Sequence, residues 1–160
     1  MLSVTVLAVG RLKDRFFEDA AGEYLKRLSA YARVETVEVK AAELPENPSA
    51  ALISAALEKE GEALLRKIPA GAAVISLCVE GKPLSSEELA AEIDKKALSG
   101  SSQLVFVIGG SYGLSEAVKR RSYLRLSMSN MTFPHRLARI MLLEQLYRAF
   151  KISRGESYHK

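Results

Sequence analysis

The sequence contains few of the residues that build metal centres, disulfide frameworks or membrane spans. Cys78 is the single cysteine among 160 residues, so the chain can form neither an internal disulfide framework nor a cysteine-rich metal site. The two histidines, His135 and His159, come with no nearby carboxylate cluster, which disfavours metal catalysis. No apolar stretch approaches the ~18 uninterrupted residues of a membrane span. We therefore expect no metal, no membrane partner and a buried, unreactive Cys78 thiol in a reducing compartment.

Signals for targeting or for several domains are also missing. The first residues, MLSVTVLAVGRLKD, lack a basic leader and a small-residue cleavage site, and are typical of a first strand rather than a signal peptide. There are no repeats or low-complexity tracts, and the two prolines of AELPENPSA (42–50) indicate a loop, not a domain boundary. A chain of this length suits one domain. We expect a single domain over residues 1–160 in a cytoplasmic protein.

Acidic residues are scarce in one part of the chain. Residues 1–116 hold 13 Lys and Arg against 17 Asp and Glu, whereas residues 117–160 hold 10 against 2. No acidic residue lies between Glu116 and Glu144, where six basic residues fall: Lys119, Arg120, Arg121, Arg125, Arg136 and Arg139. Such asymmetry indicates a polyanionic partner, or else a solvated basic face that binds nothing. Composition alone does not separate the two.

Apolar, β-branched runs alternate with segments of helical spacing. Five runs predict strands: LSVTVLAV (2–9), RVETVEV (33–39), AVISLCV (73–79), QLVFVI (103–108) and, more weakly, YLRLSM (123–128). Helical spacing covers residues 14–31, 49–68 and 85–98 between them. The last of these helices has a start signal close to a capping box, Ser85 or Ser86 before Glu87 and Glu88. The alternation predicts an α/β fold with a mostly parallel sheet of five to six strands flanked by helices.

The segment HRLARIMLLEQLYRAFKI (135–152) is apolar on nearly all sides. Its sequence leaves only a narrow charged stripe, on which Glu144 and Arg148 are spaced to pair. A helix of this kind must be covered on nearly all sides, and the domain's own sheet covers one face. We therefore expect a second subunit to cover another, in a symmetric homodimer.

Three loops that follow predicted strands have the composition of a ligand site. FVIGGSYGLSE (106–116) runs from a strand through a glycine-rich turn, in which Gly109 and Gly110 permit close backbone approach and Gly113 supplies positive φ or tight packing. EGKPLSSEE follows the third strand and SNMTFPHR the fifth. The carboxyl ends of parallel strands are where open α/β sheets bind ligands. Glycines that serve only a tight turn remain the alternative.

The ligand expected there is a nucleoside without a phosphate. The spacing G-G-x-x-G differs from the dinucleotide fingerprint G-x-G-x-x-G, and no acidic residue lies ~20 residues on to bind a ribose. None of the three loops carries clustered Lys or Arg, as a triphosphate cradle would. Met128, Met131 and Phe133 are suited to line an apolar slot, while backbone amides and carbonyls read a purine edge.

The glycine turn GGSYGLSE and the string LSMSNMTFPHRLARIMLLEQLYRAFKISRGESYHK resemble the RlmH family of SPOUT-class RNA methyltransferases. VLAVGRLKD and EGKPLSSEELA fit as well, so the resemblance covers the whole chain. It implies an α/β fold with a C-terminal trefoil knot, a homodimer, and methylation of N3 of a pseudouridine in large-subunit (23S) ribosomal RNA, on the ribosome. The methyl donor implied is S-adenosyl-L-methionine, and no DNA partner is expected.

The resemblance also implies which residues bind the methyl donor. Leu77 and Gly109 would contribute backbone contacts, and the residues that follow the fifth strand would wrap the adenosine: Met128, Ser129, Asn130, Met131, Thr132 and Phe133. These positions lie at the three strand ends identified above from their composition.

The segment ISRGESYHK (152–160) places Arg154, Tyr158 and His159 at a chain end, where residues are usually expendable. The resemblance implies that they are catalytic and reach over the partner's cofactor. Methylation at N3 requires the imide N–H of the pseudouridine to lose its proton, and this loss needs a base or a cationic environment. Histidine exchanges protons near neutral pH, tyrosine stacks or hydrogen-bonds, and arginine neutralises an anion. Base and positioning group are not separated by the sequence. We expect removal of residues 157–160 to abolish transfer.

Two other residues have open roles, and two other functions are alternatives. His135 is expected to orient the cofactor loop or cap the helix, and Arg139 to contact RNA or pair with an acid. The alternative functions are a non-catalytic ribosome- or RNA-binding protein of the same fold, and a nucleotide-dependent metabolic enzyme, which the missing ribose acid disfavours.

Overall fold

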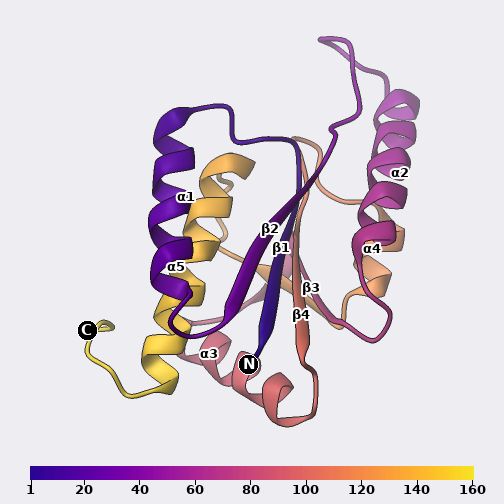
Figure 1. The fold of residues 1–160 in the computed structure, drawn as a ribbon. Helices are drawn as coiled ribbons and strands as arrows, with labels where there is room; N and C mark the ends of the chain where they lie inside the picture. The colour runs from indigo at the N-terminus through magenta and orange to yellow at the C-terminus, as the bar shows by residue number, and fades with distance from the viewer.

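The computed structural model describes residues 1–160 as one sheet of five strands with helices between them (Figure 1). The elements, in chain order, are β1 (Ser3–Val9), α1 (Arg15–Leu28), β2 (Arg33–Val39), α2 (Ala50–Lys67), β3 (Ala73–Pro83), α3 (Ser86–Leu98), β4 (Gln103–Ile108), α4 (Glu116–Arg121), β5 (Leu124–Ser127) and α5 (His135–Ser153). All five predicted strands are present. The expected α/β fold is confirmed.

Every strand pair in the sheet is parallel, and the strand order is β2-β1-β4-β3-β5. Because all strands run the same way, their carboxyl ends lie along one edge of the sheet, and the loops that follow β3, β4 and β5 meet there. The order explains why β4 and the first part of β3, residues 73–79, are almost wholly apolar, since each has a strand on both sides and helices over both faces.

Two apolar cores lie on opposite faces of the sheet, and β4 shows how one strand supplies both. Leu104, Phe106 and Ile108 belong to the core under α1, α3 and α5, whereas Val105 and Val107 belong to the core under α2 and α4. Successive side chains of a strand point to opposite faces, so a strand buried on both sides is apolar throughout. Figure 1 shows these two layers, with α1, α3 and α5 on one side and α2 and α4 on the other.

β3 is longer than the sequence predicts and is irregular. It continues from Ala73 to Pro83, and its register with β5 shifts between Leu77 and Lys82, both of which pair with Leu126. A Cβ atom at Gly81 would lie 2.8 Å from the backbone of Arg125 and Leu126, so only glycine fits this crossing. The predicted turn after residue 79 is therefore a bulge that carries the strand past β5.

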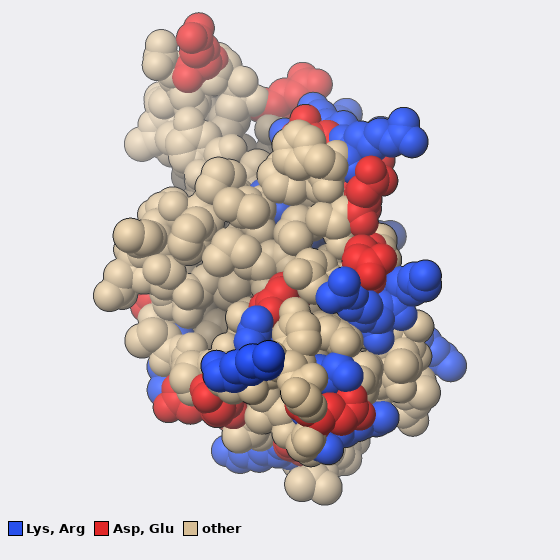
Figure 2. Space-filling view, turned by 90° about the vertical axis from the view of Figure 1, so that its left-hand side faces the viewer, with Lys and Arg blue, Asp and Glu red and all other residues tan.

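α5 packs between α1 and α3 and buries Leu142, Leu143 and Leu146 completely. Leu137 remains 37% exposed near its beginning, beside the half-buried Ile140 and Met141. Figure 2 views the molecule from the side on which α1 and α5 lie, and a broad, largely uncharged area covers the left of that face, while charged side chains gather along its right side and in its lower part. No helix in the fold combines the length and the apolar character needed to cross a membrane.

Candidate functional site

The main candidate site is a hollow at the carboxyl ends of β3, β4 and β5, here called the strand-end hollow. It has a volume of about 700 Å³, within the usual range for small-molecule sites. Most of its lining comes from three segments, the bulge after Leu77, the glycine turn after Ile108, and the residues from Met128 to Ala138; Lys119 and Leu126 complete it. Three strand ends that lie far apart in the sequence thus converge on one cavity.

Most of the residues expected to bind a methyl donor line this hollow. Seven of them do so: Leu77, Gly109, Met128, Ser129, Met131, Thr132 and Phe133. Asn130 is exposed and is not among the lining residues. Met131 is 72% exposed at the rim, an unusual environment for a large apolar side chain.

The glycine turn is shaped by contacts within itself. A Cβ atom at Gly109 would lie 2.3 Å from the carbonyl oxygen of Gly113, so the first glycine is required for the turn to close. Gly113 has a φ of +86°, and its amide donates to the carbonyl of Gly110 over 3.1 Å. The tight-turn role therefore accounts for Gly109 and Gly113, and the turn as a whole forms one wall of the hollow.

The segment after β5 is held by short-range hydrogen bonds. The hydroxyl of Ser127 donates to the carbonyl of Ser129 over 3.0 Å, and the hydroxyl of Ser129 accepts from the amide of Met131 over 3.0 Å. Pro134 then precedes α5, whose first turn has no side-chain cap. These bonds fix the loop before any ligand binds, which lowers the entropic cost of binding.

Sequence reasoning missed an ion pair at the rim of the hollow. Lys119 on α4 lies 2.5 Å from Glu80 in the bulge of β3, and both residues line the cavity. The hydrogen bond from Lys119 lowers the pKa of Glu80, and the bond to Glu80 raises the pKa of Lys119, so both side chains stay charged at neutral pH. Burial raises the pKa of the nearby Cys78 thiol, which keeps it protonated and unreactive.

His135 lines the hollow at the beginning of α5. Burial lowers its pKa, and the neighbouring charges of Arg136 and Arg139 lower it further, so the imidazole is neutral at neutral pH. Arg139 is 2% exposed, pairs with Glu38 over 2.6 Å and donates to the carbonyl of Gly10 over 3.0 Å. Two roles were expected for Arg139, contact with RNA or pairing with an acid, and the structure shows the pairing with an acid.

The tail residues Arg154, Tyr158 and His159 lie outside the strand-end hollow of their own chain. The guanidinium of Arg154 lies 4.6 Å from the ring centre of Tyr31. The hydroxyl of Tyr158 donates to Glu144 over 3.2 Å. Desolvation, followed by the charge of Glu144, raises the pKa of Tyr158, so it is a hydrogen-bond donor rather than a base in this position.

His159 is also held by side chains rather than free in solvent. Its Nδ1 lies 3.0 Å from Arg148, and its Nε2 lies 2.7 Å from Glu87 on α3. Arg148 in turn pairs with Glu144, as the spacing predicts. Glu144 lines a second hollow of about 450 Å³, here called the α5 hollow, which shares Leu126 and Met128 with the strand-end hollow. The tail therefore lies near the neighbouring cavity, not in the one at the strand ends.

Comparison with known proteins agrees with this architecture. A family model described as "Predicted SPOUT methyltransferase" matches residues 2–159. A protein of Pelotomaculum thermopropionicum named ribosomal RNA large subunit methyltransferase H is 57% identical, over 99% of both chains. The protein of the same name from Carboxydothermus hydrogenoformans is 51% identical over 99% of this chain and all of the relative.

A solved structure shares the fold at low sequence identity. A probable methylase family protein from Haemophilus influenzae Rd KW20 aligns with a TM-score of 0.51 over 99% of this chain and 70% of that one, at 13% identity. Together with the parallel sheet and its strand-end hollow, the family match and these relatives of equal length show that the chain belongs to the SPOUT methyltransferase family.

Proposed function

We propose that the protein transfers a methyl group from S-adenosyl-L-methionine to N3 of a pseudouridine in large-subunit (23S) ribosomal RNA, on the ribosome. The observation that carries the proposal is the strand-end hollow, in which seven of the eight residues expected to bind the donor come together. The substrate class is supported by relatives at 57% and 51% identity that are named ribosomal RNA large subunit methyltransferase H.

The hollow fits the proposed donor in size and in chemistry. Its apolar side chains, among them Met128, Met131 and Phe133, are suited to sandwich an adenine ring, and the ends of three strands offer backbone amides and carbonyls to its edge. The bound donor would supply an electrophilic methyl group. The protein must then place the ring nitrogen in line with that group and assist the loss of its proton.

We also propose that the protein is a homodimer and that the tail of each subunit completes the partner's site. In their own chain Arg154, Tyr158 and His159 do not line the strand-end hollow. Leu137, Ile140 and Met141 on α5 are incompletely buried, and the face in Figure 2 has a broad, largely uncharged area; apolar surface of this kind is suited to pack against its counterpart across a two-fold axis. Such packing would bring apolar surface, including the rim residue Met131, out of water.

In that arrangement the tail would add three polar side chains to those that already line the strand-end hollow. Arg154 would stabilise the imide anion or a phosphate, Tyr158 would stack on or donate to the base, and His159 would accept the proton. Removing residues 157–160 is expected to abolish methyl transfer while donor affinity stays largely intact. Unchanged turnover by the shortened protein would show that the tail takes no part.

The fold is proposed to contain the trefoil knot of its family. β5 pairs with β3 on both sides of the bulge, and Gly81 passes within Cβ-contact distance of the β5 backbone. A close crossing of this kind is compatible with a segment threaded under a loop. A crystallographic trace of residues 73–134 would test the threading directly.

The reaction is tested with isotopically labelled donor. Whole ribosomes, separated subunits and naked ribosomal RNA are each incubated with the protein, and the labelled base is mapped. We expect label on N3 of one pseudouridine of the large-subunit RNA, with most incorporation in whole ribosomes. Donor binding without any incorporation would instead favour a non-catalytic RNA-binding protein.

A further inference from the structure

A groove beside the strand-end hollow has a different character from it. The groove has a volume of about 410 Å³ and lies between the end of β1, the β2–α2 connection, the glycine turn and the beginning of α5. Three basic side chains line it: Arg11, Lys13 and Arg136. We call it the basic groove.

The cations of the basic groove are poorly neutralised. Arg11 and Lys13 are exposed, and neither takes part in an ion pair. Arg136 approaches Asp14 only to 3.7 Å, and its Nε is buried without a hydrogen-bond partner. The single carboxylate that lines the groove, Glu60, already accepts from the amide of Ala42 over 2.9 Å. The groove therefore has an excess of positive charge and a preference for an anion.

The first turn of α5 adds to this preference. The 19-residue helix begins at the wall of the groove with no side-chain cap and no acidic residue among its first positions. Its first amides are therefore not neutralised by the chain itself, and the helix dipole places partial positive charge there. His135 is neutral because burial lowers its pKa, so it adds no charge of either sign at that end of the helix.

The basic groove adjoins the strand-end hollow. Gly110, Ser111, Tyr112 and His135 line both cavities, so the groove lies directly beside the place where the reacting base would enter. Tyr112 is 49% exposed at the junction, where an aromatic ring is free to stack on a base.

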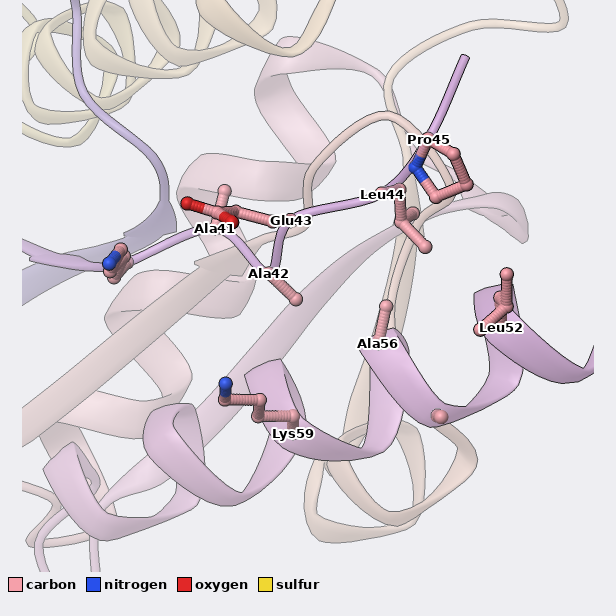
Figure 3. A pocket seen from close by; sticks show the side chains of 10 residues that line it. Ala41, Ala42, Glu43, Leu44, Pro45, Leu52, Ala56 and Lys59 are labelled. Carbon is pink, nitrogen blue, oxygen red and sulfur yellow. The ribbon is translucent and has the colours of Figure 1, made fainter. Parts of the chain in front are cut away.

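The opposite side of the β2–α2 connection offers no comparable site. A hollow of about 420 Å³ lies there over α2 (Figure 3), with Ala42 and Leu44 on one wall and Leu52 and Ala56 on the other. It shares no residue with the strand-end hollow, and Glu43 offsets one of its two lysines, Lys40 and Lys59. The basic groove differs from this hollow in its excess of positive charge and in the residues that it shares with the strand-end hollow.

We propose that the basic groove binds the phosphate backbone of the RNA strand next to the nucleotide to be methylated. The inference rests on the proposed function, because it takes the strand-end hollow as the site of the reacting base. A polyanionic strand suits the observations better than a free anion. Three cations line one groove beside the hollow, and each would neutralise a different phosphate.

The test compares two double variants of the full-length protein that remove the same charges. Arg11→Gln with Lys13→Gln alters the groove. Arg66→Gln with Lys67→Gln alters an exposed pair in the last turn of α2, which leads into the amino end of β3 at the opposite edge of the sheet. Binding of a labelled single-stranded uridine oligonucleotide is followed by fluorescence anisotropy over a range of salt concentrations, and donor binding by calorimetry.

The groove variant is expected to bind the oligonucleotide at least about tenfold more weakly than the wild type at ~0.1 M salt. Its plot of log binding constant against log salt concentration should have a slope that is shallower by about 1.4. Its donor affinity should equal that of the wild type, and its KM for ribosomes should rise with little change in kcat. The α2 variant should differ from the wild type less than twofold in oligonucleotide affinity, in donor affinity and in KM for ribosomes.

Equal losses in the two variants, no loss in the groove variant, or no binding by the wild type would each overturn the proposal. Failure of the proposed function has a different signature. In that case the wild type would transfer no methyl group, while the groove variant would still lose oligonucleotide affinity relative to the α2 variant.

Discussion

At the scale of residues, His135 links the site to the pH dependence of the protein's unfolding free energy. Burial, with help from the charges of Arg136 and Arg139, lowers its pKa in the folded state below the 6.5 of an unperturbed histidine. The unfolded chain therefore binds this proton at a higher pH than the folded one. The stability that depends on neutral His135 is present above pH 6.5 and is lost as the pH falls through and below that value.

Replacing His135 with glutamine should accordingly flatten the dependence of unfolding free energy on pH between about pH 7 and pH 5. Urea denaturation at a series of pH values measures this. The corresponding substitution His159→Gln serves as the control, because that imidazole lies between Arg148 and Glu87 at the surface. An unaltered slope in the His135 variant would show that its protonation is not coupled to folding.

At the scale of elements, Arg139 joins α5 to the ends of two strands. Its side chain is buried, pairs with Glu38 on β2 and donates to Gly10 directly after β1. Arg139→Met keeps much of the volume but leaves the Glu38 carboxylate without its partner. We expect a loss of about 2–3 kcal/mol, less than the 3–5 kcal/mol of a fully buried pair because Glu38 is partly exposed.

Arg27→Met is the matched control for Arg139→Met. It breaks the exposed pair of Arg27 and Glu23 within α1 and should destabilise the protein much less than Arg139→Met does, because solvent screens the exposed pair. Chemical denaturation of both variants compares the two losses. Equal losses would mean that the Arg139 contact is not a structural link between α5 and the sheet.

Much of the element order was predictable from the sequence, and the exceptions have physical causes. β4 was predictable because a strand that is buried on both faces has a continuous apolar run, here QLVFVI. The continuation of β3 through Glu80 and Lys82 to Pro83 was not readable, because polar residues, glycine and proline also make turns. Only the pairing with Leu126, far along the chain, makes that stretch a strand.

The candidate site was predictable to a similar extent. Parallel strands bring their carboxyl ends together, so loops with small and apolar residues after β3, β4 and β5 were sufficient to locate the hollow. The contact of Glu80 with Lys119 was not predictable, because it depends on how far the bulge carries Glu80 toward α4. The basic groove was also missed, since Arg11, Lys13 and Arg136 come from opposite ends of the sequence.

At the scale of the whole molecule, the proposed dimer makes each active site composite. A heterodimer tests this if one subunit lacks residues 157–160 and the other carries Thr132→Trp, which would fill the strand-end hollow. If tails act on the partner's site, one of the two sites in this heterodimer is intact, and it should retain about half of the wild-type activity. Both homodimers should be inactive.

Differently tagged subunits allow this heterodimer to be purified and assayed with labelled donor. An inactive heterodimer would show that each tail serves its own subunit. A sedimentation experiment on the wild type should show a dimer at micromolar concentration, and a monomer there would remove the basis for a shared site.

The central claim is that the ends of β3, β4 and β5 form the binding site for S-adenosyl-L-methionine, and calorimetric titration tests it most directly. The wild type and the control Ser54→Trp, altered on the exposed face of α2, should each bind one donor molecule per chain with the same affinity. Thr132→Trp should bind none. Donor binding by Thr132→Trp with wild-type affinity, or no saturable binding by the wild type, would contradict the account.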